Sequence, residues 1–130
     1  MSKSKIAYWI LAVLLALAFG FAGFSKLSGN PMSVEMFDKF GYSALFMYFI
    51  GACELAGGFG LVLGQVIDRR LPRLAAFGLL VIMVGAVVSH LLNDANPMTT
   101  MVPAVMLSVL LVGVIYAGKK MNASIATVQY

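Results

Sequence analysis

Four long apolar segments occupy most of this 130-residue chain, at about residues 6–24, 44–64, 74–92 and 101–118. A helix needs roughly 20 residues to cross a hydrocarbon core about 30 Å thick, so each segment is long enough to span a bilayer. Lipid offers the backbone no hydrogen bonds, and the segments lack the period-two alternation of barrel strands. The sequence therefore predicts four transmembrane helices.

The composition agrees with a lipid environment. Hydrophobic residues make up 62% of the chain and charged residues 11%, whereas soluble domains carry about 25% charged residues. Short connections between the spans predict one all-α membrane domain over residues 1–130, an antiparallel four-helix bundle. The net charge of +4 lies in these short connections and does not indicate a nucleic-acid partner. A single cysteine, Cys53, excludes an internal disulfide, a CxxC pair and a zinc cluster, and we predict no metal site.

The basic residues predict the orientation of the spans. Two lysines, Lys26 and Lys39, fall on one side of the predicted bundle. The other side collects Lys3, Lys5, Arg69, Arg70, Arg73, Lys119 and Lys120. Cytoplasmic loops are enriched in lysine and arginine, so we expect both termini in the cytoplasm and a location in the inner membrane of a bacterial cell.

The first outer loop, residues 25–43, contains the pattern of a short helix at about residues 31–40. Asn30 and Pro31 form a helix start, Gly41 ends the pattern, and Ser43 can cap the second span. Because apolar residues recur at helical spacing, we expect an amphipathic helix lying on the outer membrane face.

Glu54 is the most informative polar residue, since it falls near the middle of the second span. A carboxylate there costs about 2.5–3.5 kcal/mol on insertion scales, so Glu54 must face the bundle interior, be protonated or have a partner. Gly51 and Gly58 lie on the same helical stripe and allow a neighbouring helix to approach closely. Two interpretations stay open: a carboxyl group that joins helices, or a functional site.

Lys26 and His90 also fall in the predicted outer half of the bundle. Lys26 either extends to the outer headgroups or pairs with Glu54. Against a pair, Glu54 lies roughly nine residues below the outer end of its span, or about 13 Å at 1.5 Å per residue. His90 is either an interfacial histidine that binds polar groups or a proton carrier. We expect Glu54 to contact Lys26 or His90 directly or through one water.

Several short motifs resemble those of the DoxX-like family of small four-helix membrane proteins, over residues 6–118. They are Gly23-Phe-Ser-Lys-Leu27, Gly51-Ala-Cys-Glu-Leu-Ala-Gly-Gly58, Arg73-Leu-Ala-Ala76 and Gly85-Ala-Val-Val-Ser-His90. The family's lysine, glutamate and histidine match Lys26, Glu54 and His90. The resemblance implies the fold and links to membrane redox complexes, receptor assembly or cargo export, but it implies no particular reaction.

Three functions are compatible with these features, and whether the chain is an enzyme stays open. The first is a redox-associated membrane subunit that binds a quinone or a similar apolar ligand, with Glu54 or His90 hydrogen-bonded to the head group. No redox-cofactor motif is visible, so electrons would come from a partner. The second is a non-enzymatic accessory subunit that docks onto a larger membrane complex or a second copy. The third is a proton-coupled exporter that uses Glu54.

Overall fold

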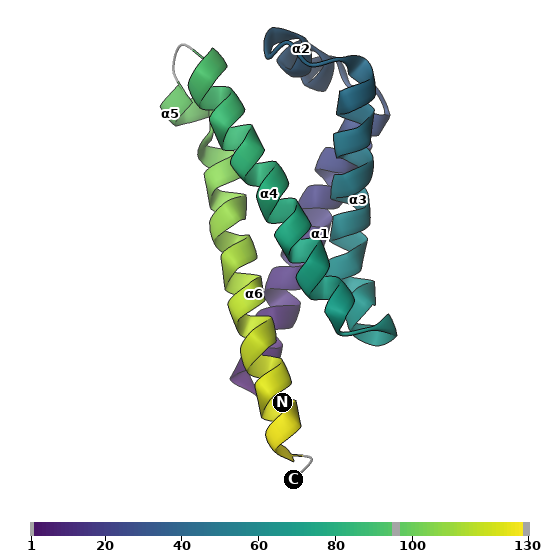
Figure 1. The fold of residues 1–130 in the computed structure, drawn as a ribbon, viewed down its shortest axis with the longest axis vertical. Helices are drawn as coiled ribbons and strands as arrows, with labels where there is room; N and C mark the ends of the chain where they lie inside the picture. Colours follow the sequence, from purple (N-terminus) through teal and green to yellow (C-terminus); the bar gives the residue numbers. More distant parts are fainter. Residues whose placement is uncertain (1, 95–96, 129–130) are drawn as a thin grey trace.

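Six helices make up the described part of the chain. The computed structural model describes residues 2–94 and 97–128, with side chains through residue 123. The helices are α1 (Lys3–Leu27), α2 (Pro31–Lys39), α3 (Ala44–Ile67), α4 (Arg70–Asn93), α5 (Pro97–Thr100) and α6 (Val102–Val128). The four long helices alternate in direction, and the short helices α2 and α5 lie at one end of them (Figure 1). We call this the α2 end, and we call the opposite end, which holds both termini and the α3–α4 turn, the basic end.

The four long helices can each cross a membrane. The spans found by length and hydropathy are Lys3–Leu27, Ala44–Ile67, Arg70–Asn93 and Val102–Ala123. Only 22–28% of the most apolar window of each span is buried within the chain, and large side chains such as Leu17 and Phe21 are 68% and 76% exposed. Such an apolar exterior needs lipid around it. The predicted all-α transmembrane bundle is confirmed.

The helices run beyond the apolar segments from which they were predicted. Only Asp68 and Arg69 separate α3 from α4, and the Asp68 carboxylate accepts a hydrogen bond from the backbone N–H of Arg70 at 2.9 Å. An apolar segment ends where lipid ends, whereas a helix can continue until its backbone meets a breaker or a cap. The basic residues at this turn therefore lie on and next to helix ends.

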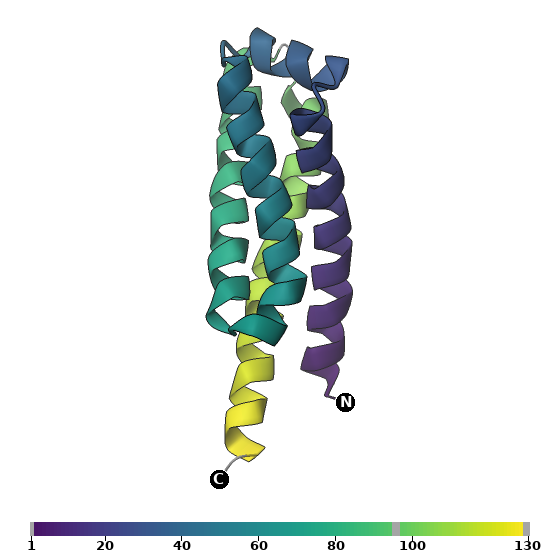
Figure 2. The same cartoon turned by 90° about the vertical axis from the view of Figure 1, so that its right-hand side faces the viewer.

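Helix α2 lies across the end of the bundle rather than along it (Figure 2). The Asn30 side chain accepts a hydrogen bond from the backbone N–H of Met32 at 3.0 Å, and Gly41 follows the helix with a positive φ of 81°. Phe37 is the buried residue of α2, with its ring 6.2 Å from that of Phe46 at the start of α3. The amphipathic helix thus packs on the start of α3 through the Phe37 side chain.

The apolar core fills the middle and the basic half of the bundle. Its fully buried side chains come from all four long helices: Tyr8, Leu15, Phe19, Leu61, Leu79, Leu111 and Val114. The Tyr8 hydroxyl donates a 2.7 Å hydrogen bond to the carbonyl oxygen of Leu61, which joins α1 to α3. Towards the α2 end, the α4–α6 pair diverges from the α1–α3 pair (Figure 1). The candidate site residues predicted from the sequence, Lys26, Glu54 and His90, come from the halves of α1, α3 and α4 towards this end.

Candidate functional site

An ion pair between α1 and α3 is the main polar feature inside the bundle. Lys26 Nζ donates to Glu54 Oε2 at 3.0 Å, and the two side chains are only 12% and 2% exposed. Glu54 therefore faces inward and has a basic partner, which offsets the cost of a carboxylate at membrane depth. The pairing is one of the two contacts expected from the sequence, and it excludes an unpartnered lysine that extends to the headgroups.

Close packing of two glycines sets the register that permits this pair. A Cβ added to Gly23 would lie 2.6 Å from the carbonyl oxygen of Gly51, and one added to Gly51 would lie 2.8 Å from Lys26 Cβ. Lys26 is thus level with Gly51, which is three residues, or about 4.5 Å of helix rise, from Glu54. The expected depth mismatch of about 13 Å is wrong, because it assumed that the outer ends of the two helices are level. The first turns of α3 instead rise beyond α1 to meet α2.

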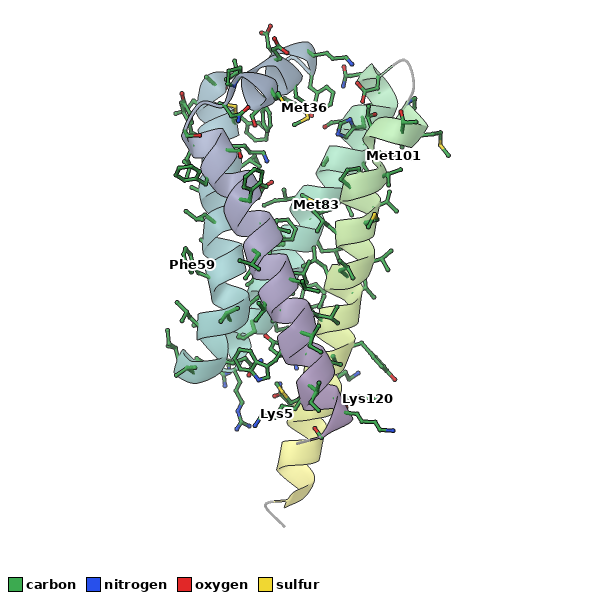
Figure 3. All side chains as sticks on the ribbon, turned by 180° about the vertical axis from the view of Figure 1, so that it is seen from behind. Lys5, Met36, Phe59, Met83, Met101 and Lys120 are labelled. Atoms are coloured by element: carbon green, nitrogen blue, oxygen red, sulfur yellow. The ribbon has the colours of Figure 1, made fainter. Side chains whose placement is uncertain are left out.

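The ion pair leaves hydrogen-bonding capacity unused. Among the described residues, Lys26 Nζ donates to one acceptor, although an ammonium group has three N–H donors. Glu54 Oε1 accepts no hydrogen bond from the same residues. In Figure 3, Met36 of α2 and Met83 of α4 lie between the two helix pairs, below α2. The largely buried pair therefore holds a free donor and a free acceptor side by side.

His90 belongs to a second polar cluster at the α2 end, so Lys26, Glu54 and His90 do not form one site. His90 Nδ1 lies 2.6 Å from Asp94 Oδ2, and the Thr100 hydroxyl donates to the same oxygen at 2.6 Å. Lys39 Nζ donates to Asp94 Oδ1 at 2.5 Å. The reason is geometric: α4 diverges from α1 and α3 at this height, and Asp94 lies one turn from His90 on its own side.

The second cluster attaches α2 and its flanking turns to α4. The rings of Phe40 and His90 pack edge to face, with their centroids 5.0 Å apart. The hydroxyl groups of Tyr42 and Ser89 lie 2.7 Å apart. Together with Lys39 and Asp94, these contacts connect the two sides of the diverging half. Asp94 was not singled out from the sequence, although the i, i+4 spacing of His90 and Asp94 was visible there.

Acidification is expected to weaken this attachment. Hydrogen bonds from Lys39, then Thr100 and His90, hold the pKa of the Asp94 carboxyl well below its ordinary value of 3.8. A lowered folded-state pKa means that the carboxylate contributes stability above pH 3.8, and that this contribution is lost as the pH falls from about 5 towards 2. Thermal unfolding in detergent should therefore show a steeper loss of Tm over this range for the natural chain than for Asp94→Asn. Parallel pH profiles for the two proteins would contradict the prediction.

An apolar groove lies between α1 and α3 on their outer surface. It has a volume of about 510 Å³, and its lining includes three small residues, Ala16, Gly20 and Gly58. Its lining consists of Val13, Ala16, Leu17, Gly20, Phe21, Leu55, Gly58, Phe59, Val62 and Leu63. Phe59 projects away from the bundle beside it (Figure 3). Neither Lys26 nor Glu54 lines the groove, so it offers shape and apolar surface without a polar anchor.

The fold and the pair define a small multi-pass membrane protein with a buried ion pair in its α2-side half. The chain belongs to the DoxX-like family, whose model matches residues 10–114. This match includes all four long helices in whole or in part, together with Lys26, Glu54 and His90. Searches of curated protein sequences and of solved structures found no match. Family membership establishes the class of protein and leaves its activity to be inferred from the site.

Proposed function

We propose that this protein is a redox-associated membrane subunit that binds a quinone or a similar apolar ligand at Lys26 and Glu54. The supporting observation is the unused donor and acceptor of this buried ion pair. A quinone carbonyl oxygen accepts hydrogen bonds, and the hydroxyl group of the reduced form donates them. Lys26 would donate to the first and Glu54 Oε1 would accept from the second. Reduction of a quinone to its quinol takes two electrons and two protons; the two electrons would come from a partner, and Glu54 would relay the two protons from water to the quinone oxygens one at a time.

Ligand content of the purified protein tests this proposal. We expect quinone extracted from the natural chain, purified in mild detergent, to approach one molecule per chain. Glu54→Leu should lose it because the acceptor is removed and Lys26 is left without a partner. Glu35→Gln, which changes an exposed carboxylate on α2, is the matched control and should retain the ligand. Equal quinone content in Glu54→Leu and the natural chain, or none in any variant, would contradict the proposal.

The groove between α1 and α3 favours a second candidate function, that of an accessory subunit in a larger membrane complex. Membrane helices associate through small residues that allow close approach, and Ala16, Gly20 and Gly58 supply such a surface. A stoichiometric membrane-protein partner that co-purifies with the natural chain and is lost on Gly20→Phe would favour this candidate. Loss of the partner with retention of quinone would separate the two functions.

We also propose that the basic end faces the cytoplasm and that the membrane is the inner membrane of a bacterial cell. The support is the asymmetry between seven basic residues at that end and two elsewhere. Reporter enzymes that are active only in the cytoplasm should be active when fused after Asp68 and inactive when fused after Thr100. The reverse pattern would overturn this orientation.

A further inference from the structure

A pocket at the basic end lies between α1, α3, α4 and α6, far from the Lys26–Glu54 pair. It is small, with a cavity volume of about 20 Å³, and it opens to the surroundings. Its walls include Tyr8 and Ala76 of the apolar core. Its polar lining consists of Gln65, Arg69, Arg73, Lys119 and Asn122. Polar groups from four separate segments thus meet at one opening.

The three basic residues of this pocket have no acidic partner in the described part of the chain. The ion pairs found there join other residues, and the nearest acid in sequence, Asp68, binds the backbone N–H of Arg70. Arg69, Arg73 and Lys119 are exposed on the rim. Three cations around one pocket attract an anion, and arginine in particular suits the oxygen atoms of a phosphate.

The pocket also contains an acceptor that lacks a donor. Among the described residues, Asn122 Oδ1 is the one side-chain oxygen or nitrogen that is completely buried and has no hydrogen-bond partner. A buried carbonyl oxygen left without a donor costs about 1–3 kcal/mol, so a ligand hydroxyl that reaches it would be favoured. The site therefore suits a molecule that combines a phosphate with a hydroxyl group.

We propose that this pocket binds the phosphate of an anionic glycerophospholipid whose headgroup carries a hydroxyl group. The phosphate lies among Arg69, Arg73 and Lys119, and the headgroup hydroxyl donates to Asn122 Oδ1. The position supports a lipid as the source, because the pocket opens at the ends of the spanning helices, where headgroups lie. Basic pockets between transmembrane helices recognise anionic headgroups in this way. The acyl chains remain in the bilayer, beside the apolar exterior of the helices.

The sequence provides matched controls for this site. Arg70 is adjacent to Arg69 but does not line the pocket, and Lys120 is adjacent to Lys119 but lies over the Tyr116 ring, with its Nζ 5.0 Å from the ring centroid. Replacing a lining residue or its neighbour by glutamine removes the same charge from the same end of the protein. The comparison therefore separates a specific site from general attraction between a basic surface and anionic lipid.

The experiment measures binding of phosphatidylglycerol, phosphatidylcholine and inorganic phosphate to the full chain in neutral detergent, by native mass spectrometry and thermal shift. We expect phosphatidylglycerol to bind best. Arg73→Gln and Lys119→Gln should each weaken phosphatidylglycerol binding about tenfold, because each removes a hydrogen bond between charged groups. Asn122→Ala should reduce the preference over phosphatidylcholine. Arg70→Gln and Lys120→Gln should retain binding.

Two outcomes would overturn the proposal. Equal losses in the lining variants and in their neighbours would show general electrostatic attraction without a site. Equal binding of inorganic phosphate and phosphatidylglycerol would show that a lipid is not the source of the phosphate. The Tm of each variant without lipid checks its folding, and because Arg73 and Lys119 lie on different helices, each tests the site independently.

Discussion

Replacing Lys26 by methionine is expected to destabilise the bundle by about 3–5 kcal/mol, the range for removing one partner of a buried ion pair. The substitution removes the positive charge from a side chain that is 12% exposed and leaves the Glu54 carboxylate, 2% exposed, without its donor. The double variant Lys26→Met with Glu54→Gln should recover much of this loss, because neither charge then remains. The free energy of unfolding can be measured by titrating the purified protein with a denaturing detergent.

The double-mutant cycle isolates the interaction between these two residues. Lys39→Met is the control, because it makes the same substitution at another lysine that forms an ion pair. The Lys39 side chain is 56% exposed, and Asp94 retains His90 as a partner when Lys39 is replaced. We expect a smaller loss for Lys39→Met than for Lys26→Met. Additive losses in the cycle would show that Lys26 and Glu54 do not interact, and the proposed ligand site would lose its basis.

The second large effect is expected at the crossing of α1 and α3. Gly23→Ala places a methyl group 2.6 Å from the carbonyl oxygen of Gly51 and 2.9 Å from the backbone nitrogen of Leu55. These are backbone atoms of a helix and cannot rotate away, so the two helices must separate. We expect a loss of about 1–3 kcal/mol, the range for an overpacked core. The quinone that we propose to bind at this pair should be lost as well, because Lys26 moves away from Glu54.

Gly20→Ala is the matched control on the same helix. A Cβ at Gly20 meets nothing within 4 Å, and alanine favours helix, so this variant should be neutral or slightly more stable. Unfolding in the same detergent titration gives both free energies, and quinone extraction reports on the ion pair. If Gly23→Ala and Gly20→Ala behaved alike, the close crossing would not be the element that positions Lys26.

Much of the candidate site was predictable from local sequence. The position of Glu54 within an apolar segment required a partner or an inward orientation, and the glycine stripe around it indicated a close neighbour. The choice between the two interpretations of Lys26 was not predictable, since it depends on the offset between α1 and α3. That offset follows from the packing of Gly23 against Gly51, which is a contact between residues far apart in the chain.

The second cluster and the basic pocket show the same limit. Lys39, His90 and Asp94 were visible as polar residues near predicted loops, but their contact requires α2 to lie across the bundle. Asn122 lies beyond the last predicted span, and it became part of a pocket because α6 continues as a helix past the apolar segment. Loops and helix ends carry weak local signals, so their neighbours are set by packing.

The amino-acid sequence alone specified that lipid surrounds the chain, how many spans it has, that their directions alternate, and that the basic residues gather at one end. These properties depend on the free energy of transferring side chains and backbone groups from water to lipid. That free energy is a sum over local segments of the chain. Which polar groups meet depended on the three-dimensional arrangement. Inside the membrane, helices are positioned by close packing of small residues, because lipid is as apolar as the helix surfaces themselves. Such packing is sensitive to single methyl groups, and the pairing of Lys26 with Glu54 follows from it.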